Sequence, residues 1–362
     1  MDDYERLRQI LDKHLAGAPP SPRLDQILRI LFTPEEARVA VGMIFAPTPV
    51  EEIAARSGVP VAETRARCES MASKAIVFSR EKNGIMGYSL LPTIPGLFEF
   101  PFMKGGGEPM HQALAKLWEE YHREGLGNSF ASSPTPITRV IPVEKAIDTR
   151  VEVLPFEVIS KMLDRNETFA LAACACRVSV GACQGPRDVC LIFDATGRFL
   201  IERGFAREIT REEALEVVRR AEEAGLVHTT NNSQDRLSLI CNCCPCCCTI
   251  LRGLTQLQNP NAFAVSRWCS RVDPDLCNGC GICEDERCPV SAIKVRESVA
   301  EVDRERCVGC GLCVTKCDAE AVHLVPRRHP PDPPQTIVEM GLKIATEKGK
   351  AEDFIKLMRR ST

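Results

Sequence analysis

Helical and strand-like patterns of apolar and polar residues follow one another within the first hundred residues of the chain. Residues 50–56 form a short amphipathic segment, and the turn at 57–60 separates it from a second predicted helix over 61–75. Two apolar runs at 76–79 and 88–91 then flank an Asn-Gly pair, which is typical of a hairpin turn. The pattern therefore predicts a helix, a turn, a second helix and a hairpin, in that order.

This order of elements resembles a winged helix-turn-helix, so we expect residues 1–100 to form a winged-helix-like domain. Its cationic side chains in the second helix and the hairpin could contact phosphates: Arg65, Arg67, Lys74, Arg80 and Lys82. Glutamates are interleaved with them, and residues 1–100 hold 12 Lys and Arg against 13 Asp and Glu. Because a DNA-binding module normally has a clear basic face, this balance favours protein docking or a structural role over DNA binding.

The middle of the chain mixes predicted helices and strands. Residues 101–140 are expected to form a helix and a linker rich in proline and serine. Residues 141–267 are expected to form a cysteine-rich α+β domain. Within it, residues 156–163 are predicted to be helical, and a strong helix over 211–224 is capped by Thr210.

The C-terminal part is predicted to hold a compact module over 268–326, followed by a proline-rich linker and a helical tail over 327–362. Strands of the module are expected near 293–296, 299–302 and 322–325. The tail has an apolar face that we interpret as a docking face, formed by Ile337, Met340, Leu342 and Ile344. Together these elements assign the chain to the α+β class.

Composition indicates a globular protein. Of 362 residues, 44% are hydrophobic and 26% are charged, which suits two or three domains with their own cores. The net charge of −3 gives no basic excess for binding nucleic acid or an acidic membrane. No apolar run reaches the ~20 residues that cross a bilayer, and the N-terminus lacks the segments of an export signal. We therefore expect a cytoplasmic protein without membrane insertion.

The chain has twenty cysteines, and their positions indicate which class of globular protein it belongs to. All except Cys68 lie between Cys174 and Cys317. In a long chain without an export signal, clustered cysteines more often bind metals or iron–sulfur clusters than form disulfides. Such usage points to an anaerobe. The isolated Cys68, in the second predicted helix, is expected to be a small buried residue.

Eight cysteines near the C-terminus form an internal repeat. Residues 277–283 read Cys-Asn-Gly-Cys-Gly-Ile-Cys and residues 307–313 read Cys-Val-Gly-Cys-Gly-Leu-Cys, followed by Cys288 and Cys317 respectively. This repeat resembles the bacterial two-cluster ferredoxin, in which the fourth cysteine of each run binds the other cluster. The resemblance implies two [4Fe–4S] clusters in a ferredoxin-like module with two βαβ halves. The implied iron ligands are Cys277, Cys280, Cys283 and Cys317 for one cluster, and Cys307, Cys310, Cys313 and Cys288 for the other.

Two details depart from the ferredoxin pattern. Four residues, not three, separate Cys283 from Cys288, and Asp318 replaces the proline that follows the last cysteine. We expect the loop to absorb the extra residue. The two-residue spacers let three thiolates converge, and the glycines between them let the backbone curl close to a cluster. A pair of zinc sites is the alternative, but the duplicated order of eight cysteines argues against it.

The middle domain carries two further groups of cysteines. The first comprises Cys174, Cys176, Cys183 and Cys190, and the second comprises Cys241, Cys243, Cys244, Cys246, Cys247 and Cys248. Six thiols from one short segment cannot all face one cluster, so some must turn toward another site, shared with the first group or with Cys269. One or two more [4Fe–4S] clusters, zinc, or reactive thiols all fit these residues.

The whole chain resembles multi-cluster iron–sulfur proteins of anaerobes. The main hypothesis is an electron-transfer protein that passes single electrons to a redox partner protein or a larger oxidoreductase complex, as a component and not as a stand-alone enzyme. The rival hypotheses are a redox-sensing winged-helix regulator and a protein that delivers clusters or metal. No P-loop or Rossmann fingerprint is present, so no nucleotide or flavin site is expected. No catalytic residue is identified, and His228 is expected to lie in a polar turn.

Overall fold

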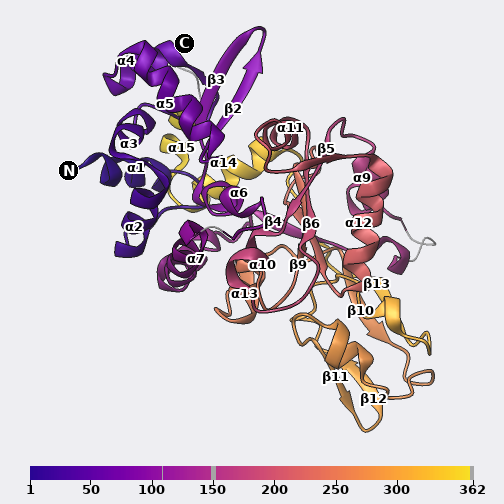
Figure 1. Ribbon diagram of the computed structural model, residues 1–362. Helices are drawn as coiled ribbons and strands as arrows, with labels where there is room; N and C mark the ends of the chain where they lie inside the picture. The colour runs from indigo at the N-terminus through magenta and orange to yellow at the C-terminus, as the bar shows by residue number, and fades with distance from the viewer. Residues whose placement is uncertain (108, 148–151, 359–362) are drawn as a thin grey trace.

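The computed structural model describes residues 1–107, 109–147 and 152–358 and is a mixed α+β fold with several antiparallel sheets (Figure 1). None of its helices, within the described residues, is long and apolar enough to cross a membrane. The N-terminal region, the central sheet and the C-terminal module follow one another across the molecule, while the C-terminal tail returns to the N-terminal helices (Figure 1).

The N-terminal region contains the predicted helix-turn-helix and hairpin. Its elements are α1 (Asp3–Asp12), α2 (Pro22–Leu31), α3 (Pro34–Ala40), β1 (Thr48–Pro49), α4 (Val50–Ser57), α5 (Val61–Ser73), β2 (Val77–Lys82) and β3 (Ile85–Leu90). Gly58 ends α4 in the left-handed conformation, with φ of 69°, which turns the chain into α5. The three strands form a sheet in the order β1-β3-β2. The predicted order of elements is confirmed, and Cys68 is fully buried in this region, as expected.

The connecting region is helical, as predicted, and packs on the N-terminal helices. It contains α6 (Glu99–Phe102), α7 (Pro109–Tyr121) and α8 (Gly127–Phe130). The hydroxyl of Tyr121 in α7 donates a hydrogen bond to the carbonyl of Pro19, 3.0 Å away. A single apolar core runs from Tyr4 to Phe205, so the N-terminal region also packs against part of the central sheet.

The central sheet has six antiparallel strands in the order β4-β8-β9-β6-β5-β7. They are β4 (Thr138–Ile141), β5 (Phe169–Ala173), β6 (Asp188–Phe193), β7 (Arg207–Ile209), β8 (Val227–Asn231) and β9 (Leu239–Cys243). The helices of this region are α9 (Ile159–Leu163), α10 (Ala175–Val180), α11 (Asp194–Glu202), α12 (Arg211–Glu223) and α13 (Thr249–Thr255). The helix predicted over 211–224 is confirmed with Thr210 as its cap. The helix predicted over 156–163 is interrupted, because Val158 has extended backbone angles.

The two faces of this sheet belong to different cores. Alternate residues such as Leu171, Leu191 and Phe193 pack with α9 and α12 on one face. Their neighbours Ala172 and Ile192 belong to the core that extends into the N-terminal region. This alternation with a period of two is what a strand buried on both sides requires.

The expectation of a polar turn at His228 is wrong. His228 lies within β8, paired with Asn242 of β9, and is fully buried. Its Nδ1 lies 2.6 Å from Oδ1 of Asn242, and its Nε2 lies 3.4 Å from a carboxylate oxygen of Glu222. The polar residues of this strand can be buried because side chains on neighbouring elements give them hydrogen bonds.

The C-terminal module, residues 268–326, contains two small antiparallel sheets. β10 (Trp268–Val272) pairs with β13 (Val322–Pro326), and β11 (Ile293–Arg296) pairs with β12 (Val299–Val302). The strands expected near 293–296, 299–302 and 322–325 are thereby confirmed. The βαβ description is not matched in detail, because the helices between the strands are single turns at Cys283–Arg287 and Val314–Lys316.

The C-terminal tail is helical, as predicted, with α14 (Ile337–Glu347) and α15 (Ala351–Met358). The apolar face that was expected to dock a partner packs largely against other residues of the same chain. Met340 and Ile344 are buried with Leu15 and Phe354, and Lys348 Nζ donates to the carbonyl of Leu15 at 2.6 Å. Leu342 is the exception, since its side chain stays exposed.

Candidate metal centres

The cysteines of the C-terminal module converge in two groups, and each group combines three thiols of one run with one thiol from the other. One small cavity, of about 20 Å³, is lined by the first four, which we call the outer thiol group: Cys277, Cys280, Cys283 and Cys317. Electrostatic interactions link the other four, the inner thiol group: Cys288, Cys307, Cys310 and Cys313. Both groupings match the ligand sets that the ferredoxin resemblance implies.

Glycine is needed where these loops curl around the thiols. Gly279 and Gly309 have φ of 68° and 70°. A Cβ atom at Gly279 would lie 2.6 Å from the backbone oxygen of Ser298, and one at Gly309 would lie 2.1 Å from the backbone oxygen of Trp268. Neither backbone oxygen can move aside cheaply, so both loops require glycine for their close approach to a neighbouring strand.

Backbone N–H groups of the strands point at the thiols in an equivalent way in the two halves. The N–H of Ala300 in β12 lies 3.4 Å from Sγ of Cys277, and the N–H of Ser270 in β10 lies 3.5 Å from Sγ of Cys307. A further N–H, that of Ala292, lies 3.1 Å from Sγ of Cys288. Such donors stabilise thiolates that bind a cluster and influence its potential.

The extra residue between Cys283 and Cys288 is absorbed as expected, and the structure shows how. The turn Cys283–Arg287 is a π-helical turn, whereas the equivalent turn Val314–Lys316 is a 3-10 turn. A π turn holds one more residue than an α turn, so the longer spacer still brings Cys288 back toward the inner thiol group.

The two groups differ in burial. In the outer thiol group Cys280 is exposed and only Cys283 is buried. In the inner thiol group Cys307, Cys310 and Cys313 are all buried. Burial raises the pKa of Cys283 to about 11 and that of Cys313 to about 12. Because a metal ligand must be a thiolate, a bound positive charge is what these sites need in order to ionise.

Cys269 lies with the module and not with the middle-domain cysteines. It is buried in β10, and its thiol contacts Cys307, where the hydrogen bond between them lowers the pKa of Cys307 to about 5. The option that Cys269 joins the residue 241–248 segment in a shared site therefore finds no support in the geometry.

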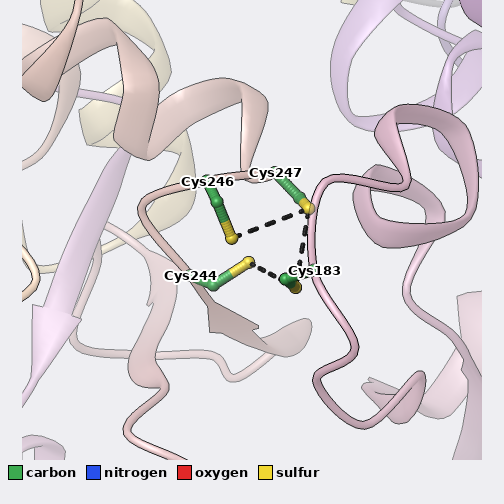
Figure 2. A group of neighbouring side chains, drawn as sticks. All are labelled: Cys183, Cys244, Cys246 and Cys247. Carbon is green, nitrogen blue, oxygen red and sulfur yellow. Dashed lines mark hydrogen bonds between the residues drawn. The ribbon is translucent and has the colours of Figure 1, made fainter. Parts of the chain in front are cut away.

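The two cysteine groups of the middle domain interleave to form two new sites, as the crowding of residues 241–248 implies. The first site is a compact set of four thiols, which we call the tetrad: Cys183, Cys244, Cys246 and Cys247 (Figure 2). Three members come from the loop after β9, and Cys183 approaches from the separate loop after α10 (Figure 2). The four Sγ atoms all lie within 4.8 Å of one another, so they can hold a metal or a cluster.

The separations within the tetrad are uniform. Sγ of Cys183 lies 3.7 Å from that of Cys247 and 4.0 Å from that of Cys244, while Cys246 and Cys247 are 3.8 Å apart. For comparison, four sulfurs at ~2.3 Å from a central tetrahedral ion lie roughly 3.8 Å apart. Although burial opposes ionisation of Cys183, the Gly185 N–H and the neighbouring thiols lower its pKa to about 7, whereas burial raises the pKa values of Cys246 and Cys247.

The remaining six thiols line a cavity beside the sheet, which we call the chamber and which Cys244 of the tetrad also borders: Cys174, Cys176, Cys190, Cys241, Cys243 and Cys248. Cys243 and Cys248 approach within 3.3 Å, and Cys174 contacts Cys176, Cys176 contacts Cys248 and Cys190 contacts Cys241. Cys241 and Cys243 alternate along β9 and both line the chamber, while the side chain of Asn242 between them bonds to His228 and to the carbonyl of Val189. Cys248 joins them as the N-cap of α13.

The chamber has a volume of about 360 Å³ and extends from the thiols to apolar residues of the N-terminal region. Phe45, Phe78 and Phe100 line this opposite end.

A buried cation lies between the tetrad and the chamber. Arg177 in α10 is 1% exposed and donates hydrogen bonds to the carbonyls of Pro186 and Asn242, at 3.0 and 2.6 Å. Although burial opposes its charge, Cys174 of the chamber and Cys244 of the tetrad raise its pKa. Among the described residues no carboxylate pairs with Arg177, so the groups that can supply its counter-charge are the neighbouring thiols once they ionise or bind metal.

Sequence reasoning missed Arg177 and Glu99. Arg177 directly follows Cys176, and a cation next to a cysteine motif is a usable signal. Glu99 comes from α6, far along the chain from the cysteines, and lines the chamber with its carboxylate accepting the N–H of Gly96 at 2.7 Å. Burial raises its pKa to about 7. Nothing in the pattern around Glu99 indicates this placement.

Comparisons with known proteins support one part of this picture. Residues 300–323 match the family model of the 4Fe-4S binding domain. Searches among curated proteins and solved structures found no match. The matched segment contains Cys307, Cys310, Cys313 and Cys317, so the chain carries a 4Fe-4S binding domain near its C-terminus, which indicates an iron–sulfur protein.

Proposed function

We propose that the chain is an iron–sulfur electron-transfer protein in which the outer and inner thiol groups each bind one [4Fe–4S] cluster. Clusters of this type supply one-electron redox chemistry. The proposal assigns Cys277, Cys280, Cys283 and Cys317 to one cluster and Cys288, Cys307, Cys310 and Cys313 to the other. The chain's own residues bind the irons, donate N–H hydrogen bonds to the thiolates and exclude water.

The observation that carries the proposal is the gradient of burial between the two groups. The outer thiol group lies at the surface, with Cys280 exposed. The inner thiol group packs against the middle domain, where the N–H of Val143 donates to the carbonyl of Cys310 at 2.9 Å. One group is thus accessible to a partner, and the other adjoins the region that holds the tetrad and the chamber.

For the tetrad we propose a single tetrahedral metal ion, with zinc as the ion that a closed four-thiolate site favours. Sulfur separations of 3.7 to 4.0 Å suit one central ion. In a cubane each thiolate binds a different iron, which requires wider spacing of the sulfurs. The ion would stabilise the junction of the loops that follow α10 and β9.

The surface around the outer thiol group supports a basic redox protein as the partner. Residues 273–320 hold 11 Asp and Glu against six Lys and Arg. Leu276, next to Cys277, is 51% exposed and gives this acidic surface an apolar contact point. An acidic rim with an exposed apolar centre suits a transient encounter steered by charge.

The regulator hypothesis receives less support, because the cations of α5 are already paired. Arg65 lies 3.0 Å from Glu51, Arg67 lies 4.0 Å from Glu63, and Lys74 forms an ion pair with Glu36. Phosphate contacts by these side chains would have to break the existing pairs.

The proposal is tested by counting iron and acid-labile sulfide in anaerobically purified protein. The intact chain should contain at least about eight of each, and Cys283→Ser and Cys313→Ser should each lose about four. Electron paramagnetic resonance of the reduced protein should show two interacting signals in the intact chain and one isolated signal in each variant. Unchanged iron in both variants would overturn the proposal.

A further inference from the structure

We propose that the chamber is a combined cofactor and ligand site: its six thiols bind an iron–sulfur cluster, and its apolar end binds a small uncharged organic molecule beside that cluster. The inference extends the proposed function, because the outer and inner thiol groups would exchange electrons with this third centre. In this proposal the chamber is a site distinct from the tetrad.

The thiols of the chamber form one continuous group. The contacts run from Cys174 to Cys176, to Cys248 and on to Cys243, while Cys241 contacts Cys190 and interacts with Cys174. Thr229 Oγ1 lies 3.5 Å from Sγ of Cys243 and so adds a polar contact to the group. Although Cys243 and Cys248 are close, the tetrad is the compact set of thiols among the described residues, so the six chamber thiols are spread more widely than one tetrahedral ion requires, which favours a cluster of several irons.

A buried cation can compensate for the charge of such a cluster. Arg177 faces Cys174 and Cys243, whereas Arg252, which lies near Cys176 and Cys248, already has Glu119 as its counter-ion. Arg252 is 3% exposed and binds Glu119 through two hydrogen bonds of 2.8 and 2.7 Å. Neutral thiols would give Arg177 no reason to be buried, whereas an anionic cluster would.

The opposite end of the chamber is suited to an uncharged molecule. Its wall is mostly apolar, with aromatic rings from the N-terminal helices and hairpin. The titratable side chains that line it are His14 and Glu99. Burial disfavours the charged forms of both, lowering the pKa of His14 and raising that of Glu99, and Glu99 also interacts with the thiols of Cys176 and Cys241. An ion entering this end would be desolvated without a partner.

The size of the chamber leaves room for both occupants. Its volume of about 360 Å³ lies within the range of small-molecule pockets, roughly 300 to 1,000 Å³. The thiols come from α10, β6, β9 and the segments next to them, whereas Leu90 and Leu91 at the base of the hairpin line the chamber from the N-terminal region. A cluster held by the thiols would therefore present one side to the apolar space.

The chamber also adjoins the inner thiol group through the interior. Cys243 and Cys248 belong to the same buried core as Cys307 and Cys310, together with Trp268. Buried side chains of this core therefore connect the chamber with the inner thiol group. This continuity is the physical basis for coupling the two sites.

The first test concerns the cluster. The double variant Cys176→Ser/Cys241→Ser should lose about four or more irons and sulfides, while it keeps the eight of the C-terminal module and their paramagnetic signals. Those retained signals report that the chain is folded. Cys68→Ser is the matched control, because it removes a buried thiol outside every site and should lose no iron.

An unchanged iron content in the double variant would overturn the chamber cluster, as would a disulfide between Cys243 and Cys248 in the metal-loaded protein. Either result leaves the proposed function intact, since the eight module irons are counted separately. Failure of the proposed function would instead appear as intact iron in Cys283→Ser and Cys313→Ser.

The second test concerns the ligand. Reduced protein is titrated with n-butyl isocyanide, a neutral probe, and with cyanide, an anion of similar donor chemistry, while the signal of the chamber cluster is followed by electron paramagnetic resonance. Isocyanide should shift this signal and bind at least ten-fold more tightly than cyanide. Leu91→Trp, which fills the apolar end, should weaken isocyanide binding by ten-fold or more without changing iron content. An unshifted signal, or equal binding of both probes, would overturn the ligand site.

Discussion

The C-terminal module and the middle domain both concentrate cysteines, but they assemble thiol sites in different ways. In the module each site takes three thiols from one loop and a fourth from the paired loop. In the middle domain both sites draw thiols from two segments more than 50 residues apart in the sequence, and a single segment, residues 241–248, divides its thiols between the tetrad and the chamber. Local spacing thus determines the first kind of site, whereas strand register determines the second.

The first prediction concerns iron loss within the module, where the largest effects are expected. Cys310→Ala and Cys280→Ala should each lose about four irons and sulfides, because each removes one ligand of a four-thiolate site. Cys310→Ala should also lower the thermal midpoint more than Cys280→Ala, since Cys310 is buried and Cys280 is exposed. Metal analysis and circular dichroism measure the two effects.

The control for this prediction is Cys68→Ala, which removes a buried thiol without touching a site. If it lost iron as the other two variants do, the loss would reflect general destabilisation. The ligand assignment would then have to be abandoned.

The difference between local spacing and strand register also explains which parts of the fold and of the candidate sites can be predicted from the sequence. The spacings around Cys277 and Cys307 predict the two module groups because a loop of seven residues closes on itself without help from the rest of the fold. The hairpin, the helix-turn-helix and the helix after Thr210 follow from equally local signals. The interactions that determine these elements lie within short segments of the chain.

The chamber and the tetrad could not be predicted in this way. Cys183 meets Cys244 only because β6 and β9 are neighbours in the sheet, and Glu99 reaches the chamber only because the N-terminal core packs on that sheet. The expectation that His228 lies in a polar turn is wrong for the same reason, since the burial of this residue depends on the pairing of β8 with β9. Long-range strand pairing carries no signature within a short segment of sequence.

The second prediction tests whether the middle-domain sites share one charge-balancing residue. Arg177→Gln should weaken metal retention by the tetrad about 10- to 100-fold, as expected for the loss of a group that supports metal ligands. The eight irons of the module should stay bound, because Arg177 faces Cys174, Cys243 and Cys244 only on the middle-domain side. Competition with a chromophoric chelator measures the change.

Arg139→Gln is the matched control, since Arg139 is also a buried arginine but its guanidinium donates to the carbonyl of Phe156 and not to a thiol site. Equal loss of metal in both variants would mean that removing any buried cation loosens the fold. The assigned role of Arg177 would then be wrong.

The third prediction uses pH to separate the chamber from the module. Burial raises the pKa of Glu99 to about 7, from the usual value of 4.5 for a glutamate. Between these values the folded chain holds a proton that the unfolded chain releases, so stability falls as the pH rises and the loss is complete above pH 7. Glu99→Gln abolishes this loss, and the variant should gain about 2 kcal/mol relative to the wild type between pH 5.5 and pH 8.

Anaerobic unfolding measured across this pH range checks the expected gain. Glu352→Gln, on the exposed surface of α15, serves as the control and should leave the pH profile unchanged. A wild-type profile that Glu99→Gln does not alter would show that the carboxyl group is solvated. The uncharged character of the apolar end would then lose its support.

The last prediction concerns the order in which metal is lost, and it expects the smallest differences. The outer thiol group has an exposed ligand at Cys280, whereas Cys307, Cys310 and Cys313 of the inner group are buried. During limited exposure to air, the four outer irons should therefore be lost several-fold faster than the four inner irons, because oxidation follows access to the thiolate. Paramagnetic signals recorded over time distinguish the two, with the single-cluster variants Cys283→Ser and Cys313→Ser as references for each signal. Equal rates would mean that the middle domain does not shield the inner group, and the burial gradient that supports directional electron transfer would lose its physical basis.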